Sequence, residues 1–272
     1  MKKSLLSTLV AGALVTGLAG PASALTFYYD AGGGFVDGSD SGFPVPIYSG
    51  YKSPLDARNS DADPNNDVYS TFNWGVDIGN GQSGGVINQV PPISTHPGTG
   101  QDLNGAIVVG GVPIDFGYVI HHNEEVSSIF GPATVVVSYN FNLYDDVAKT
   151  NLIKPWHADF LFSFKETANS DPCLDPNPKG TICDDFFSYS LIAGDPTSFT
   201  YAGKTYNINI TGFWDEPAPG GELTDIFYSP ENLDHVPAYV RASIPEPASL
   251  ALMGLGLVGL GVARRRKQVQ KA

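Results

Sequence analysis

The sequence is short of positive charge. It contains 15 Lys and Arg residues against 28 Asp and Glu residues, which gives a formal net charge of −13. Seven of the basic residues precede Leu25 or follow Ile244, whereas Glu246 is the one acidic residue in those end segments, so the stretch between them carries a formal charge of −19. Because phosphate binding requires a cationic surface, nucleic acid is not expected as a partner. Such an acidic stretch favours solubility, repulsion from anionic surfaces or binding of divalent cations.

The sequence also lacks familiar catalytic motifs. It contains no Gly-x-Ser-x-Gly, no His-Glu-x-x-His and no glycine loop of the kind that cradles phosphates. We therefore expect a protein without catalytic activity. A polysaccharide-active hydrolase is the enzymatic alternative, because paired carboxylates carry out glycoside hydrolysis. The residues that would supply such a pair are Asp159, Glu166, Asp184 and Asp185.

Residues 1–24 have the layout of a secretory signal peptide. Two lysines follow the first residue, Leu5–Leu18 is an apolar segment, and Ala22 and Ala24 are small residues at a cleavage site. We predict that signal peptidase removes this segment and that an exported chain begins at Leu25. Disulfides persist in exported proteins, so a bond between the two cysteines is compatible with this location.

Residues 244–272 form a tail of three parts. An uncharged apolar stretch, Ala248–Ala263, separates an Ile-Pro-Glu-Pro segment from a basic cluster. As a helix with a rise of about 1.5 Å per residue it spans roughly 24 Å. That is short for a hydrocarbon core of roughly 30 Å, but it is within reach of insertion. We expect a C-terminal transmembrane helix with the basic cluster on the cytoplasmic side. The motif and cluster residues are Pro245, Glu246, Pro247, Arg264, Arg265 and Arg266.

This order of parts resembles the PEP-CTERM sorting signal of exported bacterial proteins. The resemblance implies that an exosortase, a membrane protease-transpeptidase, reads the Pro-Glu-Pro segment and cuts near it. The chain would then be held at the inner membrane transiently before it reaches the cell surface or the extracellular space. The shortness of the apolar stretch fits transient residence better than permanent anchoring.

The body, residues 25–243, is expected to form one all-β domain. Its clearest strand is 134–144, where apolar residues alternate with mostly polar ones. No stretch of the body shows sustained helical periodicity. Short strands between Gly- and Pro-rich turns predict an antiparallel β-sandwich, jelly-roll-like, with long loops. The nine expected strands are 25–29 (ended by Gly32–Gly34), 68–74, 106–109, 114–121, 134–144, 160–164, 186–192, 204–213 and 237–244, and 79–85 is expected to be a loop.

Several segments of the body, in order, resemble the THxN family of exported PEP-CTERM proteins, which is similar to the choice-of-anchor K domains. They are Phe72–Gly75, Asp115–Asn123, and Glu166–Asn169 with the two cysteines that follow. The sequence departs from the family at Ile120, where the family has the Thr of its name. The resemblance implies a β-rich secreted domain and no established activity.

Cys173 and Cys183 flank a Pro-, Asp- and Gly-containing segment directly after the 160–164 strand. We predict a disulfide that closes this loop and stabilises the fold by roughly 2–3 kcal/mol. A metal site would need more soft ligands than two cysteines so placed.

His121 and Asn123 lie near two glutamates, and imidazole and carboxylate groups together bind zinc. Adjacent strand residues point to opposite faces, so His121 and His122 would not ligate one ion without a bend. We therefore favour a structural role, in which His121 and Asn123 bond backbone groups at a strand end, and keep ion binding as the alternative. A binding site would require His121, Asn123, Glu166 and Asn169 to converge.

The segment 59–67 carries oxygen ligands at alternate positions, as the first half of an EF-hand loop does. It lacks the glycine at position six, and Phe72 stands where a bidentate Glu is needed. A solvated turn explains it, and a looser calcium site is the alternative, which would make calcium the one cofactor. The oxygen ligands are Asp61, Asp63, Asn65 and Asp67.

Together these features predict an exported, exosortase-sorted protein of the cell surface or extracellular matrix, without catalytic activity and associated with exopolysaccharide or biofilm. Its expected partners are signal peptidase, an exosortase-like protease and exopolysaccharide. The alternative is a carbohydrate- or calcium-binding module, since Trp and Tyr side chains offer stacking platforms for sugars. A hydrolase is the third interpretation.

Overall fold

The computed structural model describes residues 25–63, 65–75, 82–87, 101–123, 132–167, 172–173, 175–180, 183–215, 218, 220–230 and 233–246. The predicted signal peptide and the predicted transmembrane segment lie outside these residues. Within the described ranges, no helix has the length and apolar character needed to cross a membrane. The one helix there is a single 3-10 turn, η1 (Ala57–Ser60).

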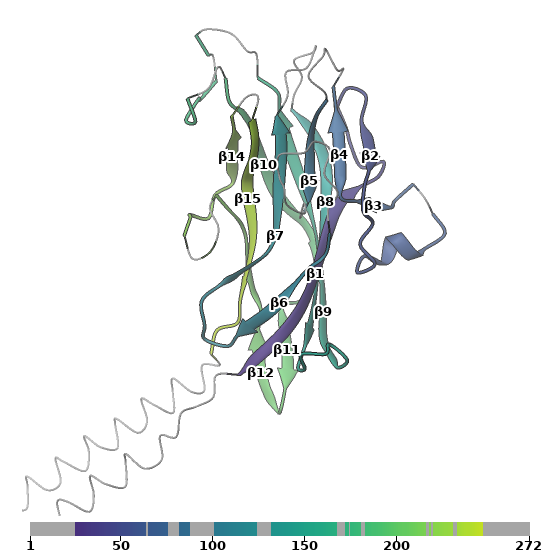
Figure 1. Ribbon diagram of the computed structural model, residues 1–272, viewed down its shortest axis with the longest axis vertical. Coiled ribbons are helices and arrows are strands. Elements are labelled where there is room, and N and C mark those ends of the chain that lie inside the picture. Colours follow the sequence, from purple (N-terminus) through teal and green to yellow (C-terminus); the bar gives the residue numbers. More distant parts are fainter. Residues whose placement is uncertain are drawn as a thin grey trace, which may run out of the picture.

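The described chain is otherwise built from β-strands joined by turns (Figure 1). The strands are β1 (Thr26–Val36), β2 (Ile47–Ser49), β3 (Val68–Tyr69), β4 (Thr71–Trp74), β5 (Ser83–Ile87), β6 (Leu103–Val108), β7 (Ile114–Asn123), β8 (Ala133–Tyr144), β9 (Leu152–Lys165), β10 (Asp185–Gly194), β11 (Ser198–Tyr201), β12 (Lys204–Asn207), β13 (Asn209–Trp214), β14 (Ile226–Ser229) and β15 (Leu233–Ser243).

These strands form two large sheets and one hairpin. Sheet A has the order β14-β10-β9-β8-β1-β3, and β6 also pairs with β1. Sheet B has the order β13-β15-β7-β5-β4-β2. β11 and β12 form the separate hairpin. Every pairing between these strands is antiparallel. The prediction of an all-β, antiparallel body is confirmed.

The two sheets face each other across one core of aromatic side chains. Trp74 of sheet B lies 4.8 Å from Phe164 of sheet A, measured between ring centroids. Phe116 of sheet B lies 5.1 Å from Phe141 of sheet A. Aromatic pairs at such distances stabilise by about 0.5–1.5 kcal/mol beyond the burial of their area. This core is the packing that a sandwich requires, whereas the jelly-roll connectivity stays a prediction.

The alternating sequence of β8 places its apolar residues in this core. Val137, Tyr139, Phe141 and Leu143 are fully buried, and each is separated from the next by one residue on the opposite face. β9 repeats the pattern with Phe160, Phe162 and Phe164. Both strands were predicted, although β9 begins at Leu152, earlier than expected.

The glycine-rich strands were predicted wrongly. Gly32–Gly34 lie inside β1 rather than ending it, and Gly84 and Gly85 lie in β5 rather than in a loop. A Cβ atom at Gly34 would come within 2.5 Å of the Tyr69 carbonyl oxygen, and one at Gly85 within 2.7 Å of the Phe35 ring. These positions are glycine because a neighbouring strand or ring approaches the backbone closely. These glycines are therefore not explained by a turn conformation.

The described residues form fifteen strands where nine were expected for the body, because several short strands carry no clear alternation. β2, β11 and β14 were not predicted at all, and the expected strand 204–213 is divided into β12 and β13.

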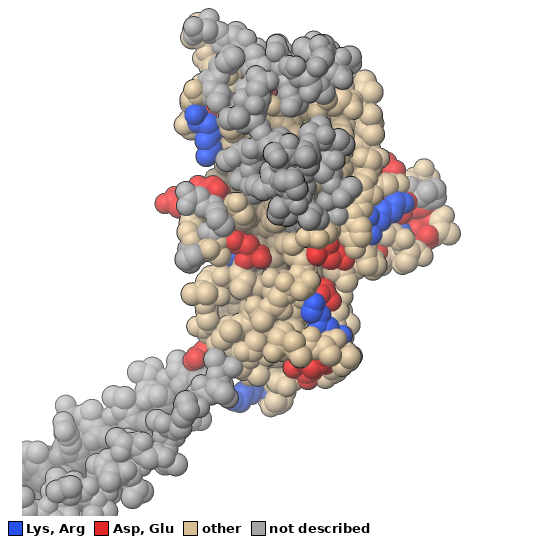
Figure 2. Space-filling model, in the orientation of Figure 1, with Lys and Arg blue, Asp and Glu red and all other residues tan. Residues whose placement is uncertain are grey.

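The surface of the described residues combines acidic groups with a few paired basic ones. Figure 2 shows Lys and Arg side chains next to Asp and Glu at several places on one face, with wide areas that carry neither charge. Ion pairs join Lys149 to Asp30 and Lys165 to Asp175.

Candidate functional site

The C-terminal sorting segment begins where the folded body ends. β15 stops at Ser243, and Ile244 then forms a single parallel bridge to Val109. The Gly110 amide donates a hydrogen bond of 2.8 Å to the Ile244 carbonyl oxygen. Ile244 is 1% exposed, whereas Pro245 and Glu246 are exposed. Proline has no N–H to extend a ladder, so Pro245 is a natural end for the sheet.

Glu246 lies against the turn that follows β6. Gly110 in this turn has a φ of +71°, and a Cβ atom there would come within 2.8 Å of the Glu246 Cγ. Glycine at this position therefore serves two needs, the left-handed backbone conformation and the close approach of the sorting segment.

The start of the body is fastened to the same turn. The Val109 amide donates a hydrogen bond of 2.9 Å to the Leu25 carbonyl oxygen. Adjacent amides, those of Val109 and Gly110, thus hold the first and the last residues of the described body. Figure 1 shows that β1 begins and β15 ends at the same end of the molecule. Cleavage at the predicted signal site and near Pro-Glu-Pro would therefore act at one end of the body.

The described chain is an all-β body that ends in an exposed Pro-Glu segment. Residues 243–267 match the PEP-CTERM protein-sorting motif. The motif implies exosortase-dependent export, membrane passage and sorting to the surface. No curated protein sequence matches the chain. Of the predicted motif residues, Pro247, Arg264, Arg265 and Arg266 lie outside the described residues, as do Ala22 and Ala24 of the signal cleavage site.

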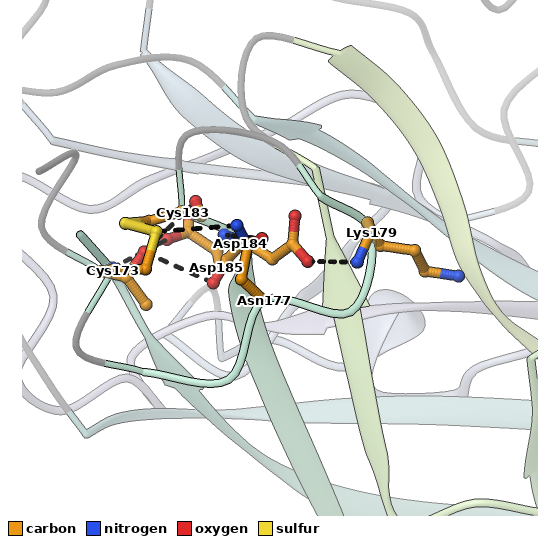
Figure 3. Close-up of a disulfide and its surroundings, with 7 residues drawn as sticks. Cys173, Asn177, Lys179, Cys183, Asp184 and Asp185 are labelled. Atoms are coloured by element: carbon orange, nitrogen blue, oxygen red, sulfur yellow. Dashed lines mark hydrogen bonds between the residues drawn. A yellow bond between two sulfur atoms is a disulfide. The ribbon is translucent and has the colours of Figure 1, made fainter. Parts of the chain in front are cut away.

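The disulfide between Cys173 and Cys183 is present, with the two Cα atoms 5.6 Å apart (Figure 3). Two further bonds hold its loop closed. The Asp184 carboxylate accepts a hydrogen bond of 2.6 Å from the Lys179 amide, and the Asp184 amide donates one of 3.3 Å to the Asn177 side chain. The prediction of a structural disulfide is confirmed.

Two carboxylates near this loop, those of Asp184 and Asp185, accept hydrogen bonds from backbone amides. Asp185 is fully buried, and its Oδ1 accepts a hydrogen bond of 2.7 Å from the Thr167 amide. Glu166 is also buried, directly after β9. Asp159 lies seven residues before Glu166, roughly 23 Å along an extended chain. Glycosidase carboxylates are about 5–9.5 Å apart, so Asp159 is too far away to act with Glu166.

His121 and Asn123 occupy different surroundings on β7. The His121 ring is buried, stacks on Trp74 at 5.6 Å and meets Phe164 edge-on at 5.2 Å. The Asn123 side-chain amide donates hydrogen bonds of 3.2 Å to the carbonyl oxygens of Ser229 and Pro230. Asn123 therefore ties β7 of sheet B to the end of β14 in sheet A. Asn169, the fourth residue of the predicted convergence, lies outside the described residues.

The acidic loop folds on itself through short-range bonds. The Asp63 amide donates to Asp61 Oδ1 at 2.8 Å, and the Asn65 amide donates to Asp63 Oδ1 at 3.0 Å. These are Asx turns, in which the side chain replaces a backbone acceptor. Asp67 faces elsewhere and pairs with Lys52. No group of three or more His, Cys, Asp or Glu side chains in the described parts of the chain is placed to hold a metal ion, and calcium binding stays a prediction.

A polar cluster that the sequence did not reveal lies on the outer face of sheet A. Arg58 of η1 reaches Asp56 at 2.9 Å and makes a two-pronged contact of 3.0 and 3.3 Å with Asp159 of β9. Ser138 and Asn140 of β8 donate to Asp56 at 2.7 and 2.8 Å. The cluster fastens the loop between β2 and β3 onto the strands beneath it.

The charges in this cluster shift one another's pKa values. Burial would raise the pKa of Asp56, but hydrogen bonds from Arg58 and Ser138 outweigh it and hold this pKa well below its usual range. A hydrogen bond of 3.0 Å to Asp159 raises the pKa of His157. Burial works to raise the pKa of Asp159, and the bonds from His157 and Arg58 lower it overall. The one sequence signal for this cluster is the polar face of β8, which includes Ser138 and Asn140.

Proposed function

We propose that this chain is a non-catalytic protein of the cell surface or extracellular matrix, delivered by an exosortase and associated with exopolysaccharide. Signal peptidase removes residues 1–24, the apolar tail holds the chain in the inner membrane transiently, and exosortase cuts near Pro247. One observation carries the proposal, the position of an exposed Pro245-Glu246 directly after the buried Ile244. A cut beyond Ile244 leaves the core of the body untouched.

The surroundings of the polar residues support a scaffold role for the body. The carboxylates of Asp184 and Asp185 bind backbone amides, Asp56 and Asp159 bind Arg58, and Asn123 binds carbonyl oxygens. Each of these side chains therefore already has a partner within the body. We propose that the body is a β-sandwich of the THxN or choice-of-anchor K type.

Substitution of the motif tests the sorting proposal. We expect Pro245→Ala and Glu246→Ala to leave the chain in the membrane fraction with its tail attached, because the protease reads these residues. Glu222→Ala, which changes an exposed glutamate outside the motif, is the matched control and should leave sorting unchanged. Normal delivery of both motif variants to the surface would refute the proposal.

Carbohydrate binding is a second candidate, favoured by a row of aromatic residues across sheet B. Trp214 of β13 pairs with Tyr239 of β15, which in turn pairs with Tyr118 of β7. The two tyrosine rings lie 6.2 Å apart, and all three residues are half-buried. Their neighbours Phe213 and Val240 are in the core, so Trp214 and Tyr239 project from the outer face.

Aromatic faces of this kind stack on sugar rings. The Arg241 guanidinium, which pairs with Asp115 at 2.8 Å, lies over the Trp214 ring at 4.2 Å from its centroid and covers one face of it. A glycan array with the native chain and with Tyr239→Ala decides this candidate. Tyr228→Ala, which removes a half-buried tyrosine of sheet A, is the control. Equal signals from the native chain and both variants, or no signal from any of them, would reject it.

A further inference from the structure

One side of β10 is open. β10 pairs with β9 from Phe186 to Gly194, but on its other side β14 covers Asp185–Ser188 alone. No strand of the described residues pairs with the remaining edge, Tyr189–Gly194. Leu191 is 61% exposed and Ile192 is 53% exposed on this edge. We call Tyr189–Gly194 the β10 edge.

The β10 edge carries few of the features that usually prevent strands from joining. Natural edges are protected by lysine, proline, charged side chains or bulges. The segment contains no charged residue and no proline. Its one irregularity is a bulge at Ile192, where the register with β9 shifts between Leu191 and Ala193. A bulge limits the registers in which another strand can pair, but it does not remove the unpaired backbone groups.

A cleft of about 210 Å³ runs beside this edge, between β10 of sheet A and β13 of sheet B. Its lining is partly aromatic, and Gly194 and Gly212 contribute backbone to it. The Tyr189 hydroxyl accepts a hydrogen bond of 3.1 Å from the Phe213 amide and closes one end. The lining includes Trp156, Phe160, Tyr189, Leu191 and Ile210.

An open edge and a cleft together form the two halves of a strand-addition site. Backbone groups of the edge supply hydrogen bonds, and a pocket beside it receives alternate side chains of the added strand. An apolar cavity of about 150 Å³ is large enough to bind benzene. The cleft is therefore large enough for an aromatic or branched aliphatic side chain.

Charge indicates which strand this site receives. The chain has a net charge of −13, so two copies repel each other over most of their surfaces. The β10 edge is neutral, so pairing it with itself places no like charges opposite each other. An identical edge also supplies an aliphatic side chain, that of Leu191, to cover the cleft of the partner. Self-pairing about a two-fold axis uses the same surface on both copies and closes as a dimer.

We propose that the β10 edge pairs antiparallel with the β10 edge of a second copy of this chain. Sheet A then continues across the dimer, and Leu191 of each copy lies over the cleft of the other. The interface is small, so the dimer forms in a concentration-dependent way, as weak and transient complexes do. This inference goes beyond the proposed sorting function, and it holds whether or not the tail is cut.

Light scattering of the full-length chain in nonionic detergent, over a wide range of protein concentrations, tests the dimer. Leu191→Lys and Ile192→Lys place like charges in the interface. Val147→Lys is the matched control, because Val147 is 72% exposed in the turn between β8 and β9. We expect the native chain and the control to double in mass as concentration rises. The two edge variants should need at least about a tenfold higher concentration.

Hydrogen exchange adds a second readout that does not depend on mass. The amides of residues 190–194 should exchange more slowly at high concentration in the native chain and the control, but not in the edge variants. A native chain that stays monomeric, or edge variants that dimerise as well as the control, would overturn the proposal. Association through the tail would give that second result. Slow exchange at 190–194 in a monomeric chain would assign the edge to a different strand and would overturn it as well.

Discussion

The Gly110 amide donates a hydrogen bond to the Ile244 carbonyl oxygen, and through it the β6–β7 turn holds the buried residue that directly precedes Pro245. The preceding amide, that of Val109, holds Leu25 in the same way. The body therefore presents both of its ends, and with them both predicted cleavage sites, at one place. On the proposed processing, adjacent residues in one turn set where the two proteases would meet the chain.

Gly110→Ala tests this arrangement. The new Cβ would displace Glu246, and the left-handed backbone would cost about 1 kcal/mol of stability. We expect a smaller processed fraction in cells, measured by the size of the surface protein. Gly203→Ala is the matched control, because Gly203 has a similar φ of +73° with open space around it. The two variants should lose similar stability, and a similar loss of processing in both would contradict the role of Gly110.

Arg58→Ala should destabilise the body strongly. The substitution removes the positive partner of Asp56, which is 2% exposed. It also removes one of the two partners of Asp159, which keeps its hydrogen bond with His157. Breaking a buried ion pair costs about 3–5 kcal/mol, and we expect the lower end because the Arg58 side chain is 21% exposed. Chemical denaturation measures the change.

Lys165→Ala serves as the control for that measurement. Lys165 pairs with Asp175 on the surface, where its side chain is 37% exposed, so its loss should cost less than about 1 kcal/mol. A cost for Arg58→Ala no larger than that of the control would show that the cluster does not hold the loop.

His157 gives the body a pH-dependent contribution to stability. Its pKa is raised in the folded state by Asp159, so protonated His157 stabilises the fold. This contribution is complete below the unfolded pKa of about 6.5 and disappears as pH rises through the higher folded pKa. We expect His157→Gln to be less stable than the native chain near pH 6, with the difference disappearing in mildly alkaline solution. Thermal unfolding at several pH values measures this, and a difference that grows with pH would reverse the assignment.

Replacing Cys173 and Cys183 by serine should lower the free energy of unfolding by about 3 kcal/mol. The disulfide closes a short loop between residues ten positions apart, and its loss frees that loop in the unfolded chain. The native chain in a reducing agent should show the same loss, and the double variant should not respond to the reductant. A reductant effect on the double variant would mean that the agent acts elsewhere.

Strands in which apolar and polar residues alternate could be predicted from the sequence. Strands that form because of contacts with distant parts of the chain were missed. β8 was predicted because every second residue enters the core. The central glycines of β1 and β5 looked like turns, since the strand and the ring that approach them lie far away in the sequence. Short strands such as β14 gain their order from neighbours and have no pattern of their own.

The same division applies to the candidate site. The sorting motif could be predicted because its parts are contiguous in the sequence. The disulfide could be predicted because its two cysteines flank one loop. The Arg58 cluster could not be predicted, because Arg58 and Asp159 are 101 residues apart and only the fold brings them together. The turn that binds Leu25 and Ile244 could not be predicted either, because Val109 and Gly110 have no side-chain chemistry that marks such a role.

The intact mass of the protein recovered from the cell surface tests the central claim most directly. Exosortase sorting predicts a chain that begins at Leu25 and ends near Pro247, with the apolar stretch and the basic cluster removed. A surface protein that still carries Arg264, Arg265 and Arg266 would contradict it.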